Sequence, residues 1–210
     1  YNGKNINPDS ILSIDKKCTE EMIEDGLPAS LIEEIGQPYL EEICKDTPPL
    51  GEKILLPLQP IKKARGSSLG YDEKDFLKLT LAGIKQAGKS SELNITSHPD
   101  ITLDIFDKEL LEVKYGEGIE DVKNAHTVLG MFSMQMVIGF LWGRKVASIQ
   151  PTLSSTDPSP LSRWGLVPII RNSDELAEFI KKPINFTNNT YLLKDIIGSL
   201  NRLEKFCDSS

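Results

Sequence analysis

Three ionisable residues lie close together near the middle of the chain: Asp100, Glu112 and Lys114. If residues 112 and 114 share a strand, their side chains project from the same face, because side chains along a strand alternate with a period of two. Two carboxylates and an ammonium group on an otherwise apolar ribbon are costly to bury unless they bind an ion or one another. The pattern therefore predicts either an ion-binding active site or a strand-capping aspartate beside a solvated Glu–Lys pair.

Two short strands would position these residues. The segments Ile101–Phe106 and Glu109–Tyr115 are rich in β-branched, aliphatic and aromatic residues and are bounded by proline and glycine, which predicts a hairpin. Before them, Asp72–Ala87 has the 3.6-residue apolar period of an amphipathic helix. After them, we expect one long buried helix over Ile119–Trp142 and a strand over Lys145–Gln150.

The rest of the chain supplies further elements. Leu93–Thr96 and Trp164–Ile170 are predicted strands, because both are apolar runs of strand length. Asn172 is expected to cap a helix over Ser173–Lys181, with an acidic residue three positions after the cap. The amphipathic pattern of Tyr191–Phe206 predicts a final helix.

The domain organisation follows from length and composition. With 210 residues, of which 39% are hydrophobic and 26% charged, the chain has the composition of a soluble globular protein, most simply of one domain. Residues 1–50 predict an acidic helical lead-in, and residues 51–70, with their prolines and glycines, a loop or linker. Residues 71–150 would form the α/β core, and residues 151–210 a strand and helices that pack on it.

The spacing of Pro99-Asp100 and Glu112-Val113-Lys114 resembles the motif of the PD-(D/E)XK nuclease superfamily. The order of elements over residues 71–150 is similar to that superfamily's restriction-endonuclease-like core: helix, three strands, helix, strand. Residues 109–125 also resemble nuclease-like effector domains. The resemblance implies an α/β fold with an acidic helical extension before the core and a helical tail after it, and a metal-dependent hydrolase of DNA or RNA phosphodiester bonds.

The same resemblance implies a role for each motif residue. Asp100, Glu112 and the carbonyl group of Val113 would bind Mg²⁺ or Mn²⁺, which are hard cations that prefer oxygen ligands. Lys114 would orient the attacking water and stabilise the charged transition state. Glu73, on the preceding helix, would be a further metal ligand.

Other polar residues would support such a site. Asp104, Gln135 and His98 are candidates for positions around it, and Gln135 has the alternative role of a buried glutamine satisfied by the backbone. Contacts to nucleic acid are expected from a basic cluster, whose alternative role is solvated surface: Lys62, Lys63 and Arg65.

The charge of the chain limits these hypotheses. A net charge of −7 and a pI of about 5.0 argue against a large sequence-independent footprint on nucleic acid. They remain compatible with a nuclease whose acidic groups gather around metal ions. The alternative function is a catalytically inactive nuclease-like module that binds a protein partner, or joins a larger parent chain, through its acidic helices.

Cysteine usage and apolar runs indicate a compartment. Three widely spaced cysteines favour a reducing environment, the cytoplasm or the nucleus. Three glycosylation sequons, at Asn94, Asn185 and Asn188, leave secretion open. No apolar run is long enough to predict a membrane span, so no membrane partner is expected.

Overall fold

The computed structural model describes residues 8–101, 113–183 and 194–209. Contacts divide the chain into two compact units, one formed by residues 48–187 and the other by residues 1–47 together with 188–210. This division differs from the predicted succession of lead-in, linker, core and tail. In particular, the predicted linker 51–70 contains the central strand of the larger unit.

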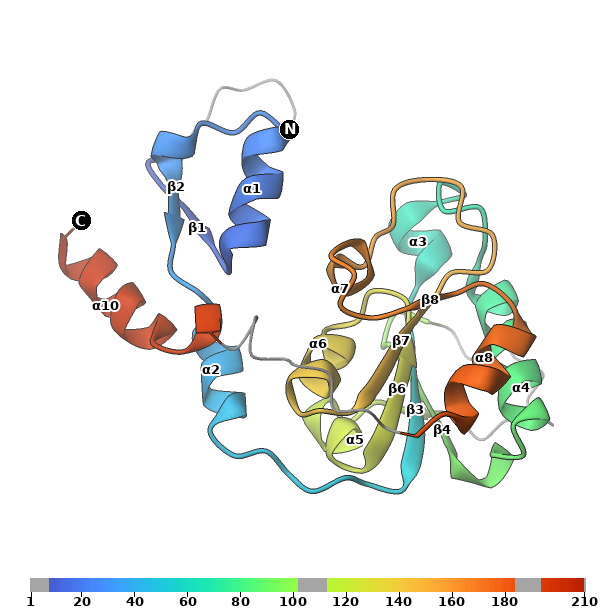
Figure 1. The fold of residues 1–210 in the computed structure, drawn as a ribbon. Coiled ribbons are helices and arrows are strands. Elements are labelled where there is room, and N and C mark those ends of the chain that lie inside the picture. The colour runs from blue at the N-terminus through green and yellow to red at the C-terminus, as the bar shows by residue number, and fades with distance from the viewer. Residues whose placement is uncertain (1–7, 102–112, 184–193, 210) are drawn as a thin grey trace. The chain divides into compact units, whose positions relative to one another are not determined.

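The larger unit is built on a six-stranded sheet in which all neighbouring strands are parallel (Figure 1). From one edge to the other, the strands are β5 (Val113–Tyr115), β4 (Leu93–Ser97), β3 (Lys53–Leu58), β6 (Ala125–Gly130), β7 (Lys145–Ile149) and β8 (Ile169–Ile170). When β3 is counted as the first strand, this order is 3-2-1-4-5-6. It is the order of the doubly wound Rossmann fold.

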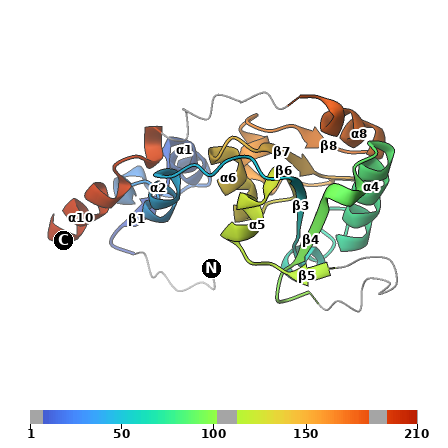
Figure 2. The same ribbon diagram turned by 90° about the horizontal axis from the view of Figure 1, so that it is seen from below.

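Helices cover both faces of this sheet, as a parallel sheet requires. Figures 1 and 2 show α4 and α8 on one face and α5 and α6 on the other. The helices of this unit are α3 (Ile61–Arg65), α4 (Glu73–Gln86), α5 (Ile119–Lys123), α6 (Met134–Leu141), α7 (Pro160–Arg163) and α8 (Ser173–Lys181), with a 3-10 turn at Ser90–Glu92.

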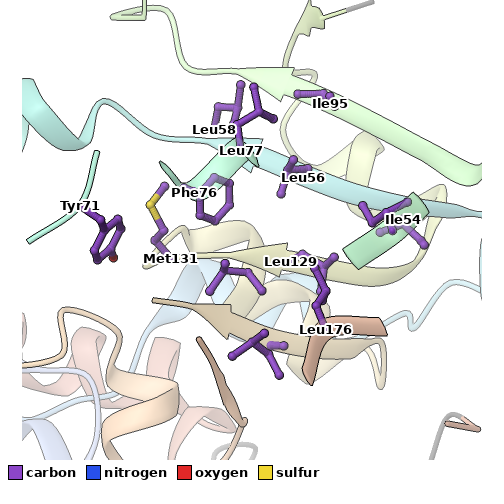
Figure 3. Packing of buried hydrophobic residues seen from close by; sticks show 14 of the residues in the cluster. Ile54, Leu56, Leu58, Tyr71, Phe76, Leu77, Ile95, Leu129, Met131 and Leu176 are labelled. Atoms are coloured by element: carbon purple, nitrogen blue, oxygen red, sulfur yellow. The ribbon is translucent and has the colours of Figure 1, made fainter. Parts of the chain in front are cut away.

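The main core lies between the sheet and the α4–α8 pair (Figure 3). Ile54 and Leu56 of β3, Phe76 of α4 and Leu176 of α8 are completely buried. Fully burying an aliphatic or aromatic side chain contributes about 1.5–3 kcal/mol relative to leaving it in water. The central strand is therefore fixed by its packing as well as by its ladder hydrogen bonds.

In the described part of the chain, the smaller unit contains a two-stranded parallel sheet and several helical segments. Its elements are β1 (Ile11–Ser13), α1 (Lys16–Glu24), a 3-10 turn at Ala29–Leu31, β2 (Ile32–Glu34), α2 (Pro38–Cys44) and α10 (Ser199–Ser209). The Asp15 side chain caps α1 by accepting the Cys18 N–H at 2.7 Å. The Glu41 carboxylate of α2 accepts the N–H groups of Gly198 at 2.7 Å and Leu200 at 2.9 Å, and so caps the start of α10.

The predicted restriction-endonuclease-like core is wrong. The sheet is parallel throughout, and residues 113–115, the described part of the predicted second hairpin strand, form an edge strand parallel to β4. Most of the other predicted hairpin strand, from residue 102 onward, lies outside the described residues. The predicted linker 51–70 was marked by Pro57 and Pro60, but Pro57 lies at the next-to-last position of β3, where the ladder is about to end.

The predicted helix Ile119–Trp142 is also wrong. The segment divides into α5, the buried strand β6 and α6. A strand covered on both faces is apolar at every position, so periodicity cannot distinguish it from a buried helix. Helix α4, helix α8 and strands β4 and β7 confirm the predicted elements within a residue or two, whereas the predicted strand Trp164–Ile170 shrinks to two residues.

Candidate functional site

A cavity of about 230 Å³ lies at the carboxyl edge of the sheet, at the ends of β3 and β4 and the start of α6. It is lined by Pro57, Leu58, Gln59, Thr96, Ser97, His98, Pro99, Gly116, Gly118, Ser133 and Gln135. Between β3 and β6 the chain connections turn to opposite faces of the sheet, which leaves a crevice at this edge. The cavity therefore lies where doubly wound folds bind their ligands.

The start of α6 forms one wall. Ser133 is the N-cap residue, and its Oγ accepts the N–H of Gln135 at 3.2 Å. The side-chain oxygen of Gln59 accepts the N–H of Phe132 at 3.0 Å, which ties the loop after β3 to the loop after β6. The first turn of α6 carries no acidic residue. The positive end of the helix dipole is thus directed toward the crevice without a charged side chain to balance it.

His98 lies on the opposite wall, just after β4. Its N–H donates to the carbonyl of Leu58 at 3.2 Å, which anchors the turn to the end of β3. The Nδ1 atom accepts the N–H of Asp100 at 3.1 Å. A neutral imidazole that accepts at Nδ1 carries its proton on Nε2. The exposed His98 ring therefore retains a donor for a ligand.

A short glycine loop closes the cavity between β5 and α5. Asp121 is buried, and its carboxylate accepts the N–H of Glu117 at 2.6 Å. Burial raises the pKa of Asp121, and the hydrogen bonds from the backbone and from Asn94 oppose this shift. The Gln135 side chain donates to the carbonyl of Gly118 at 2.9 Å, so this residue joins α6 to the loop.

Basic residues follow the cavity in helix α3. Lys62, Lys63 and Arg65 are exposed and lie within six residues of Gln59 in the lining. The Lys63 Nζ lies 3.1 Å from an Asp100 carboxylate oxygen, and the Arg65 guanidinium lies 5.7 Å from the centre of the Phe132 ring. Asp100 offsets the charge of Lys63, so these side chains together place a net positive charge beside the crevice.

The structure locates most of the residues that the sequence singled out. His98 and Gln135 line the cavity, and Asp100 lies next to it in the ion pair with Lys63. Glu73 instead accepts the N–H of Lys62 at 2.9 Å, and so satisfies the first turn of α3, whose N-cap is a proline.

The remaining motif residues are only partly described. Val113 and Lys114 belong to β5, of which the structure describes only the backbone at these two positions. Glu112 and Asp104 lie outside the described residues. Within the described ranges, no group of three or more His, Cys, Asp or Glu side chains could hold a metal ion. The expected Mg²⁺ or Mn²⁺ ion therefore stays a prediction.

Sequence reasoning missed Gln59, Ser133 and the glycine loop as site residues. One signal for Ser133 was available: a serine directly before the apolar run Met134–Leu141 is a typical N-cap. Gln59 carried no comparable signal, because its role depends on a contact with Phe132, 73 positions away.

The strand order and the crevice together define a Rossmann-like α/β fold. No protein-family model matches the chain, and no curated protein matches it by sequence. Solved structures are similar to it. One is the Methanocaldococcus jannaschii UDP-GlcNAc 2-epimerase in complex with UDP-GlcNAc and UDP, at 14% identity and a TM-score of 0.56, over 92% of this chain and 61% of that one.

Two more solved structures give the same result. The Neisseria meningitidis UDP-GlcNAc 2-epimerase bound to UDP-GlcNAc matches at 10% identity and a TM-score of 0.56, over 95% of this chain and 61% of that one. The wall teichoic acid polymerase TagF matches at 16% identity and a TM-score of 0.51, over 94% of this chain and 53% of that one. The chain thus spans about three fifths or less of the length of these proteins, and the likeness shows the fold.

These findings correct the functional predictions. The structural neighbours are UDP-GlcNAc 2-epimerases and a wall teichoic acid polymerase, not PD-(D/E)XK nucleases. The predicted nuclease activity and the predicted DNA or RNA partner are therefore wrong. The alternative, an inactive nuclease-like module, is not supported either. The described helices include none that is long and apolar enough to cross a membrane.

Proposed function

We propose that the crevice binds a nucleotide sugar through its diphosphate, and that the chain is part of an enzyme that transfers or rearranges the sugar. The observation that carries this proposal is the meeting of the α6 N-terminus, His98 and Gln135 in one cavity at the switch point of the sheet. In this fold class, ligands bind outside the carboxyl ends of the strands at that point.

The charges around the cavity suit an anionic ligand. Among the described residues, none that lines it is acidic. The unbalanced N-terminus of α6 presents backbone N–H groups to an anion. The basic residues of α3 are close in sequence to the lining, and such local positive charge attracts an anion even though the whole chain carries a net charge of −7.

His98 and Ser133 have distinct roles in this proposal. The Nε2–H of His98 donates to a phosphate or sugar oxygen, and the α6 N-terminus behind Ser133 holds the diphosphate. When a sugar leaves its nucleotide, negative charge develops on the diphosphate. Donors that are already fixed in position stabilise that charge without reorganising. Both walls of the cavity are held by hydrogen bonds, from the His98 N–H to the Leu58 carbonyl and from the Phe132 N–H to the Gln59 side chain, which provide such fixed positions.

The proposal is tested by calorimetric titration of the purified protein with UDP, UDP-GlcNAc and uridine. We expect UDP and UDP-GlcNAc to bind and uridine, which has no diphosphate, to bind much more weakly. His98→Ala, which removes the donor, should weaken UDP binding at least tenfold, because a hydrogen bond to a charged group contributes about 1.5–3 kcal/mol.

The second histidine of the chain provides a matched control. His126 lies at the start of β6, at the amino ends of the strands, whereas the crevice lies at their carboxyl ends. Its Nε2 atom is 3.1 Å from a Glu92 carboxylate oxygen. His126→Ala should bind UDP as tightly as the unaltered protein. Equal affinity for uridine and UDP, no UDP binding, or an equal loss in both histidine variants would refute the proposal.

A further inference from the structure

A second cavity, of about 180 Å³, lies at the opposite, amino edge of the same sheet. It is bounded by the end of α6, the start of β7, the segment before β8 and the end of α8. Its walls are largely apolar, with Phe140, Val167 and Phe179 among them. Three cationic residues complete the lining: Arg144, Lys145 and Lys182.

Arg144 is the most buried of these cations, with 3% of its surface exposed. One terminal nitrogen of its guanidinium donates to the carbonyls of Pro48 at 3.2 Å and Pro49 at 2.7 Å. The Nε atom is buried and has no hydrogen-bond partner among the described residues. Burial lowers the pKa of Arg144. The guanidinium thus keeps an unused donor and, within the described chain, is paired with no carboxylate.

Lys145 is partly buried, and its ammonium group also donates to backbone carbonyls. Its Nζ donates to the carbonyls of Ile180, at 3.3 Å, and Lys182, which belong to the end of α8. It also lies 4.6 Å from the centre of the Phe179 ring. Burial lowers the pKa of Lys145, and the positive charge of Lys182 adds to this effect. Over the described residues, no carboxylate forms an ion pair with Lys145 either.

Gathering three cations around one cavity is unfavourable unless an anion balances them. Arg144 and, in part, Lys145 are removed from water and lose hydration, which carbonyl dipoles replace only in part. An anion within the cavity would accept hydrogen bonds from these donors, and charge-assisted bonds are about twice as strong as neutral ones. The apolar rings on the other walls would bury the uncharged part of the same ligand.

We propose that this cavity binds a small organic anion, a carboxylate on a short apolar chain. Its volume is below the roughly 300–1,000 Å³ of sites for drug-sized ligands, so the ligand is smaller than a nucleotide. The apolar walls favour a carboxylate with a hydrocarbon body over inorganic phosphate. Because the cavity is on the opposite edge of the sheet from the UDP crevice, this site does not depend on the proposed function.

The test uses hexanoate as the probe, with hexanol and inorganic phosphate for comparison, by calorimetric titration of the whole chain. We expect saturable binding of hexanoate and at least tenfold weaker binding of hexanol and of phosphate. Hexanoate at about 100 times its dissociation constant should also raise the melting temperature by about 5–10 °C.

Two exposed lysines at the end of α8 give a matched pair of variants. Lys182 lines the cavity and Lys181 does not. Lys182→Gln should weaken hexanoate binding at least threefold, and Lys181→Gln should leave it unchanged. Leu166→Asp, at a partly exposed lining position, supplies an internal carboxylate and should abolish binding.

Three results would overturn the proposal. The first is the absence of hexanoate binding by a folded protein. The second is an affinity for hexanol or for phosphate equal to that for hexanoate. Equal affinity for hexanol would show that the charge does not contribute to binding, and equal affinity for phosphate that the apolar chain does not. The third is equal binding by the Lys181 and Lys182 variants, which would place the probe elsewhere.

Discussion

Replacing Gly83 by alanine tests how closely α4 and α8 approach. A Cβ atom at residue 83 would lie 2.8 Å from the Cβ, Cγ and Cδ2 atoms of Leu176, which is completely buried. Carbon atoms prefer separations of about 3.5–4.0 Å, so the added methyl group overpacks the contact, at a cost of about 1–3 kcal/mol. Alanine in a helix is favoured over glycine by about 1 kcal/mol. The free energy of unfolding should therefore fall by about 0–2 kcal/mol.

A double-mutant cycle measured by urea unfolding separates these two effects. Leu176→Ala alone should lower the free energy of unfolding by about 2–5 kcal/mol. In the double variant the methyl group at position 83 faces the vacated space. The loss in free energy of unfolding should therefore be smaller than the sum of the two single-variant losses, by a coupling energy of about 1–3 kcal/mol. Ala82→Gly, at an exposed position of the same helix, calibrates the helix propensity. If Gly83→Ala stabilised the protein by the full propensity difference, the close approach of the two helices would be refuted.

Two further predictions concern buried polar groups. Tyr71→Phe removes the hydroxyl that donates to the buried Gln150 side chain, and should lower the free energy of unfolding by about 1–3 kcal/mol. The loss is measured by thermal unfolding, and a value near zero would argue against that hydrogen bond. Burial raises the pKa of Asp121 above its ordinary value of 3.8, so ionisation of this carboxyl group opposes folding. The free energy of unfolding should therefore decline as the pH rises from 3.8 through the folded-state pKa, and Asp121→Asn should flatten this part of the pH profile.

The sequence predicted those elements that carry their own local signals. Asn172 caps α8 as predicted, and the 3.6-residue apolar period located α4, whose N-cap is Asp72. Strand β6 carried no such signal, because a strand buried on both faces shows no alternation. Strand β3 was predicted as part of a linker, so two neighbouring strands were missing from the predicted sheet. Without them the switch point between β3 and β6 was concealed.

The candidate site could be predicted only in part for a related reason. Gln135 was a candidate as a polar residue in an apolar segment, and His98 because it directly precedes Pro99-Asp100; both line the cavity. Their partners come from loops that follow other strands, and Gln59 meets Phe132 only because β3 and β6 are neighbours. A short motif such as Pro99-Asp100 does not record which strands are neighbours. Topology decides which polar residues share a site, and the sequence pattern alone left that topology open.

The position of β3 has a consequence for how the chain acquires its structure. This strand is the first of its sheet to be synthesised, but it occupies the centre and pairs on one side with β4 and on the other with β6. At about 5–20 residues per second, several seconds pass between the synthesis of Leu58 and that of Ala125. During that time an apolar strand has an unpaired edge, to which other chains could attach. Folding of the larger unit is therefore expected to be slow, to depend on contacts distant in sequence, and to benefit from chaperones.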